Sequence, residues 1–247
     1  MRHLCRVLAA LGLVIPAALA AQTAPRWQWT ASATVFAPQP SGTISVTGIG
    51  GPDMLGGAGD LAIDVQARRG DWAFLLDGSY LGLEEPPRDN SNNPGGGSVD
   101  SGGAQSRQRS LQGLALRRVG SSVEIAFGAV VNHVSENLAV YGKFLGNPFA
   151  VTQNSAADWA LPLVGVRYTP VDSDRWHLVF FGEGGYLGSD NTMYQVVPAV
   201  GYRIGPTVEI AAQVRVMGTT YRAPSSPSDF AYSVRTTALG GGVGLRF

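Results

Sequence analysis

The amino-acid sequence predicts an all-β fold: a transmembrane antiparallel up-and-down β-barrel of about ten strands, with eight or twelve as the alternative counts. Three observations lead to this class. Most of the chain alternates between apolar and polar residues, in segments about as long as a tilted spanning strand of about 9–11 residues. The N-terminus has the pattern of an export signal. No later stretch is apolar for the roughly 18 residues of a spanning helix, but an exported chain can still cross a membrane as a closed barrel.

Residues 1–20 are predicted to be a cleaved signal peptide, and residues 21–247 the barrel. Two arginines precede a short apolar run at 7–15, and Ala18-Leu19-Ala20 matches a cleavage site. The single cysteine, Cys5, lies within the signal, so neither thiol nor disulfide chemistry is expected after cleavage. Removing the two arginines of the signal leaves 16 basic against 18 acidic residues, a net charge of −2, which argues against nucleic acid as a partner.

The first half of the predicted barrel contains five alternating segments. In the first of them, Trp27 and Val35 lie on one face and Thr30 and Thr34 on the other. The same alternation predicts strands at 27–35, 57–68, 72–83, 107–118 and 122–135. Tight turns are predicted at 69–71 and 119–122, and the stretch 84–105, rich in Gly, Asn and Ser, is predicted to be a long loop.

The second half contains five further segments. Val208, Ile210 and Val214 alternate with Glu209 and Arg215, which is typical of a strand between two different environments. The pattern predicts strands at 159–169, 175–187, 192–204, 207–219 and 231–247, separated by turns at 170–174 and 205–206. A second long loop is predicted over 136–157.

The connections between these strands alternate in length. Bacterial single-chain barrels have even strand numbers, short periplasmic turns and longer extracellular loops. The pattern therefore predicts that both termini lie in the periplasm, and that the loops 84–105 and 136–157 lie outside the cell.

Aromatic residues gather near the ends of the predicted strands, on the apolar face. Two girdles are predicted: Trp27, Trp72, Tyr168, Trp176, Tyr202 and Phe247 near the short turns, and Tyr80, Tyr186 and Tyr194 near the opposite ends. Aromatic girdles mark the two lipid interfaces of membrane barrels. A secreted β-sandwich, the alternative all-β class, would bury these rings in the middle of its strands.

The last strand ends on an alternation of Val243, Leu245 and Phe247, which resembles the terminal strand of bacterial outer-membrane β-barrels. The resemblance extends to Trp176-x-Leu-x-x-x-Gly-Glu-Gly-Gly-Tyr, Gly188-Ser-Asp, Gly201-Tyr-Arg and Gly240-x-x-x-Gly-x-x-Phe247, which look like a largely uncharacterised family of porin-like small barrels. It implies residence in the outer membrane among lipid and lipopolysaccharide. It also implies that periplasmic chaperones and the barrel-assembly machinery handle the chain and read its last strand. Leu161 departs from the family, where an acidic residue is expected.

Charged residues on the polar faces balance one another. The predicted lumen ladder contains five acids and five bases: Asp64, Asp77, Glu124, Glu183 and Glu209 with Arg68, Arg118, Arg167, Arg203 and Arg215. Such a ladder either lines a selective pore or fills a small barrel with ion pairs.

The expected function is therefore that of a porin-like or structural outer-membrane protein, with passive passage of small solutes or ions through a narrow lumen. The alternative is a surface interaction or adhesion protein that acts through the loops 84–105 and 136–157. Oligomeric state is left open, and no cofactor or metal site is expected.

A third alternative is a lipid-modifying enzyme. His133-x-Ser135 lies on the apolar face near a rim and is similar to the His-x-Ser pair of outer-membrane lipid A deacylases. A serine nucleophile needs a base that is held by a third group. The acid expected about a dozen residues later falls at Asn147, so the triad is predicted to be incomplete and the protein not to be an enzyme.

Overall fold

The computed structural model describes residues 26–45, 57–85, 97–144, 147–222 and 231–247. The predicted signal peptide lies outside these residues. Within the described ranges, no helix is long and apolar enough to cross a membrane.

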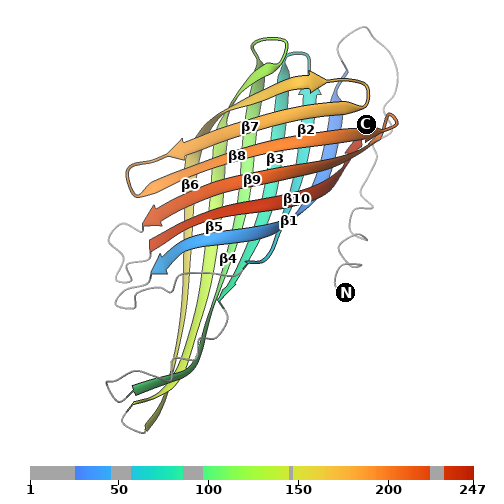
Figure 1. The fold of residues 1–247 in the computed structure, drawn as a ribbon. Coiled ribbons are helices and arrows are strands. Elements are labelled where there is room, and N and C mark those ends of the chain that lie inside the picture. The colour runs from blue at the N-terminus through green and yellow to red at the C-terminus, as the bar shows by residue number, and fades with distance from the viewer. Residues whose placement is uncertain (1–25, 46–56, 86–96, 145–146, 223–230) are drawn as a thin grey trace.

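Ten strands close into one antiparallel barrel (Figure 1), which confirms the predicted fold class and strand count. Each strand pairs with its neighbours in the sequence, and β1 pairs with β10 to close the ring. The strands are β1 (Gln28–Ser45), β2 (Gly57–Arg69), β3 (Trp72–Glu85), β4 (Gly97–Arg118), β5 (Val123–Phe144), β6 (Asn147–Asp172), β7 (Trp176–Tyr186), β8 (Asn191–Ile204), β9 (Val208–Arg222) and β10 (Ala231–Arg246).

The two ends of the barrel differ in their connections. At one end, which we call the turn end, connections of two to four residues join β2 to β3, β4 to β5, β6 to β7 and β8 to β9. Gly70 and Gly205 lie in two of these turns with φ of 60° and 73°, a conformation that side chains with a Cβ disfavour. Phe247 is also at the turn end, where its backbone N–H donates to the carbonyl of Trp29 at 2.9 Å. We call the opposite end the loop end.

The strands at the loop end are longer than the sequence pattern predicts. The stretch 136–157 is not a loop, because β5 continues to Phe144 and β6 begins at Asn147. Of the predicted loop 84–105, residues 97–105 belong to β4, and 86–96 lie outside the described residues. Figure 1 shows β4, β5 and β6 extending far beyond the other strands toward the lower left. The backbone ladder continues there although the alternation of apolar and polar residues stops.

Side chains alternate between the outer wall and the lumen along each strand. Outward residues such as Val164, Leu239 and Val243 are exposed by 68%, 67% and 52%, although they are apolar. Inward residues such as Leu116 and Val130 are fully buried. A ring of exposed aliphatic side chains is typical of a barrel whose outer wall faces lipid.

The nine predicted girdle aromatics lie near the strand ends. Exposed fractions are 43% for Trp27, 53% for Trp176 and 63% for Phe247 at the turn end, and 66% for Tyr186 at the other end. Rings at the turn end contact one another in pairs: Trp27 with Phe74, Trp72 with Phe127, Tyr168 with Phe180, and Trp176 with Tyr202. Their role at a lipid interface stays a prediction.

The seam between β1 and β10 closes the barrel. Its register runs from Thr30 opposite Arg246 to Ser45 opposite Ala231. On the β10 side, Gly240, Gly241, Gly242 and Gly244 face β1. Because Gly240 has no Cβ, the Phe36 ring can lie directly over it inside the lumen.

Candidate functional site

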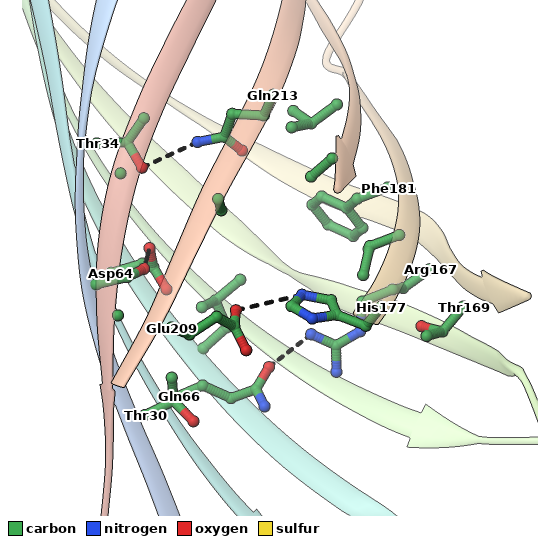
Figure 2. A pocket seen from close by; sticks show the side chains of 18 of the residues that line it. Thr30, Thr34, Asp64, Gln66, Arg167, Thr169, His177, Phe181, Glu209 and Gln213 are labelled. Atoms are coloured by element: carbon green, nitrogen blue, oxygen red, sulfur yellow. Dashed lines mark hydrogen bonds and ion pairs between the residues drawn. The ribbon is translucent and has the colours of Figure 1, made fainter. Parts of the chain in front are cut away.

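A cavity of about 640 Å³ occupies the lumen at the turn end. Nine of the ten residues of the predicted charge ladder line it, and the tenth, Glu183, lies at its inner end. Figure 2 shows side chains from opposite walls pointing into this space, among them Asp64, Gln66, Arg167, His177 and Glu209.

Glu124 of β5 lies at the centre of one group of polar contacts. It forms an ion pair with Nη2 of Arg68 at 2.6 Å and accepts a hydrogen bond from Nε of Arg167 at 2.5 Å. Nη1 of Arg167 also donates to the side-chain carbonyl of Gln66 on β2 at 2.5 Å (Figure 2). Contacts between β2, β5 and β6 therefore cross the mouth of the lumen and tie non-adjacent strands together.

A second group gathers around Arg203 of β8. Its guanidinium contacts Asp172 at 2.6 Å and Glu209 at 3.7 Å, and donates to the backbone carbonyl of Ser173 at 2.5 Å. His177 Nε2 lies 3.2 Å from Glu209 Oε1 (Figure 2). Arg118 also lines the mouth but is exposed to solvent.

Two acids face each other farther inside. Asp64 of β2 and Asp77 of β3 are direct partners in the strand register, and both line the cavity. Ser32 donates its hydroxyl to Asp64. Two ionised carboxylates directly opposite each other would destabilise a sheet.

Polar contacts also close the inner end of the cavity. Gln112 and Gln195 donate to the two carboxylate oxygens of Glu183, at 2.9 and 3.2 Å. Arg215 forms a buried ion pair with Asp60, and its guanidinium lies 4.0 Å from the centre of the Phe36 ring. A cation over an aromatic face is attracted by the quadrupole of the ring, which is negative at its face.

Beyond this layer the lumen becomes apolar and aromatic. Trp159 of β6 stacks on Tyr221 of β9 at 4.4 Å with an interplanar angle of 9°, and its centroid lies 6.0 Å from the ring of Tyr232 on β10. The Tyr232 hydroxyl donates to Gln108 of β4 at 2.8 Å. We call Trp159, Tyr221 and Tyr232 the aromatic septum, because their contacts join opposite walls. Buried Leu81, Leu83, Leu161, Leu163, Met193 and Met217 surround it.

None of the septum residues lines the cavity, so the cavity ends on the turn-end side of the septum. Trp159 is 6% exposed and Tyr232 is fully buried. The septum was not predicted from the sequence. The alternation along β6 does indicate that Trp159 points into the lumen, because it is an even number of residues from the inward Arg167 and therefore lies on the same face.

The outer face carries a second candidate site at the loop end. His133 Nδ1 lies 2.7 Å from Asp158 Oδ1 on the neighbouring strand. Sequence spacing placed the acid of a triad at position 147, but Asn147 pairs with Phe144 at the far tip of the hairpin, and the acid beside His133 is Asp158. Local spacing could not reveal Asp158, because its proximity to His133 depends on the register of β5 against β6. No cluster of three or more metal-ligating side chains occurs in the described part of the chain.

Comparison with known proteins identifies the fold. No family model matches the chain, and no curated protein matches it. Among solved structures, the outer membrane protease OmpT from Escherichia coli is similar with a TM-score of 0.51 and 8% identity, over 93% of this chain and 98% of that one. The translocator domain of the autotransporter NalP from Neisseria meningitidis gives a TM-score of 0.49 and 13% identity, over 100% and 94%.

The toluene transporter TbuX from Ralstonia pickettii gives a TM-score of 0.42 and 9% identity, over 89% of this chain and 88% of that one. At 8% identity, the likeness to the outer membrane protease shows the fold alone, so the function has to be argued from the sites. The closed ten-strand antiparallel barrel described above has the fold of a bacterial outer-membrane β-barrel.

Proposed function

We propose that this protein resides in the outer membrane as a porin-like barrel, and that its lumen is a polar vestibule closed by the aromatic septum. The turn end faces the periplasm in this proposal, because short turns occupy that side in bacterial barrels. Lipid and lipopolysaccharide surround the outer wall. Periplasmic chaperones and the barrel-assembly machinery receive the chain, and the outward row Val243, Leu245 and Phe247 is the segment that the machinery reads.

The cavity is the observation that carries this proposal. Its volume of about 640 Å³ is within the range of small-molecule sites, which is roughly 300–1,000 Å³. A small polar solute entering from the turn end meets guanidinium and carboxylate groups that are already paired, such as Arg68, Glu124 and Arg167. Paired charges of both signs favour hydrated solutes over apolar ones and give weak selectivity for charge.

Passage beyond the vestibule requires the septum to move. Trp159 and Tyr221 stack across the path, and both lie among buried apolar side chains. The indole N–H of Trp159 is buried without a hydrogen-bond partner in the described residues, which costs stability. A residue that lowers stability where aromatic rings from opposite walls meet is well suited to act as a gate.

Conductance in planar bilayers tests the gate. Trp159→Ala removes the ring between the two walls and is expected to give channels of larger unitary conductance than the wild type. Trp72→Ala is the matched control, because it removes the same ring from outside the lumen. Each variant must first show the heat-modifiable gel migration of a folded barrel.

Wild-type conductance in Trp72→Ala and enlarged conductance in Trp159→Ala support the gate. A folded Trp159→Ala variant without conductance, also when combined with Tyr221→Ala, would overturn the proposal of passage.

Surface interaction is the second candidate, and the extension of β4, β5 and β6 favours it. Residues 147–162 of β6 pair with β5, whereas pairing with β7 begins only at Leu163. One edge of this stretch therefore has no strand partner among the described residues. An open edge can accept an extended segment from another protein. This surface becomes the leading candidate if the septum variants do not conduct.

A further inference from the structure

Four strands bring polar side chains into one row on the outer wall. Tyr80 of β3 is opposite Arg109 of β4, Arg109 is opposite His133 of β5, and His133 is opposite Asp158 of β6. The next outward row toward the loop end places Arg107 opposite Ser135. This constellation lies outside the lumen, so it is independent of the vestibule and the septum.

The His133–Asp158 contact defines which nitrogen can act as a base. A carboxylate only accepts hydrogen bonds, so Nδ1 of neutral His133 must carry the proton that it shares with Asp158 at 2.7 Å. Nε2 then has a free lone pair. The two side chains are partly open, with exposed fractions of 41% for His133 and 75% for Asp158, so a substrate can approach the imidazole.

Ser135 is the nearest candidate nucleophile. It lies two residues beyond His133 on the same strand, and therefore on the same outward face, about 7 Å away along the backbone. Side-chain rotation can bring Oγ within reach of Nε2 over this spacing. The serine, the histidine and the aspartate then have the roles of nucleophile, base and orienting acid.

Arg107 adds positive charge beside the serine. It is the direct partner of Ser135 in the register and is exposed on the outer face. Ser135 is paired with β4 on one side and with β6 on the other, so the backbone N–H groups around it are held in the ladder and a side chain has to stabilise an oxyanion here. A guanidinium at that position can do so.

The position of the row selects the substrate class. Between His133 and the turn end, the outward face of β5 is apolar at Ile125, Phe127 and Val131, which are exposed by 48%, 47% and 53%. The apolar band ends at the row of His133, where charged groups begin. A molecule with its hydrocarbon part on the apolar wall would hold its polar linkage at this level, as the acyl esters of a lipid do.

We propose that Ser135, His133 and Asp158 form a hydrolytic site for the acyl esters of membrane lipids, with Arg107 beside the oxyanion. Ser135 Oγ attacks the ester carbonyl while its proton moves to Nε2 of His133. The carbon–oxygen bond to the alcohol breaks, and the alcohol leaves with that proton, so the acyl group is now on Ser135. Water attacks the acyl-serine and gives a proton to His133. The fatty acid leaves, and the proton returns to Ser135.

The test uses the full barrel, folded in detergent, with 4-nitrophenyl palmitate in mixed micelles as the probe. Wild type is expected to release nitrophenol, and Ser135→Ala and His133→Ala to lower the rate by about 100-fold or more. Ser233→Ala is the matched control, because Ser233 is an exposed serine on β10, distant in the register from this row. A fluorophosphonate probe should label wild type and Ser233→Ala, and should not label Ser135→Ala.

Asp158 is a positioning residue, so its variant needs a different readout. Asp158→Asn should lower kcat and leave KM near the wild-type value, because substrate contacts remain. A drop in fluorophosphonate labelling should accompany it. Each variant has to retain heat-modifiable migration, which separates loss of chemistry from loss of folding.

Three results would overturn the proposal: a wild-type rate no higher than that of Ser135→Ala, labelling that persists in Ser135→Ala, or hydrolysis of 4-nitrophenyl acetate without hydrolysis of the palmitate ester. Conductance of the septum variants does not depend on this row, so failure here leaves the porin-like proposal standing.

Discussion

The two halves of the lumen are built on the same strands but have opposite chemistry. At the turn end, charged and amide side chains surround a cavity of about 640 Å³. Toward the loop end, Trp159 and Tyr232 lie in a cluster of buried apolar residues and are almost or wholly inaccessible. The difference shows that a small barrel need not be filled uniformly. Ion pairs can remain hydrated in one half while a packed core holds the other half closed.

The largest difference in unfolding free energy is expected between two variants that each introduce one aspartate, one in each half of the lumen. Leu161 is 1% exposed inside the cluster, whereas Ala199 lines the cavity. Leu161→Asp buries a carboxylate without a partner and should cost more than about 4 kcal/mol of unfolding free energy, enough to prevent assembly. Ala199→Asp should cost less than about 1 kcal/mol, because water reaches it. Urea unfolding in detergent measures both, and equal losses would contradict the division of the lumen.

Removing the carboxylate at the centre of the mouth should have the next largest effect. Glu124 is 6% exposed and contacts both Arg68 and Arg167. Glu124→Ala leaves two guanidiniums without their partner and should lower the unfolding free energy by about 3 kcal/mol. Arg118→Ala, at an exposed position of the same mouth, should change it by less than about 0.5 kcal/mol. If both variants unfold at the wild-type urea concentration, the ion pairs do not hold the strands together.

A smaller effect is expected from the hydroxyl in the septum. Tyr232→Phe keeps the ring but leaves Gln108 without its donor, and should cost about 1–2 kcal/mol. Tyr194→Phe on the outer wall, where the ring is 42% exposed, should be close to neutral. Intrinsic fluorescence during urea titration follows both variants. A neutral Tyr232→Phe would show that ring packing alone closes the septum.

Alternation predicted the barrel well and the septum poorly. Ten strands, their inward acids and their outward aliphatics all follow from period-two patterning, because a membrane wall imposes one solvent on each face. The pattern assigns a face to each residue but does not say what lies across the lumen. The contact between Trp159 and Tyr221 joins β6 to β9, and depends on the tilt and closure of the ring.

Two other features could not be predicted from the residue pattern of a single segment. The extensions of β4, β5 and β6 have polar residues on both faces, so they read as loops although their backbones pair. Sequence spacing places the expected acidic partner of His133 at Asn147, whereas the register of β5 against β6 places Asp158 beside His133. Register is a property of two strands, and one strand's sequence encodes only half of it.

The seam between β1 and β10 has a kinetic consequence. Every other pair in the ring joins strands that are consecutive in the sequence, but this seam joins Thr30 to Arg246. Closing such a long loop has an entropic cost that local hairpins do not bear, so we expect the hairpins between consecutive strands to form before the ring closes. Ring closure is therefore expected to be the slow step of folding, because it joins the two most distant strands of the chain.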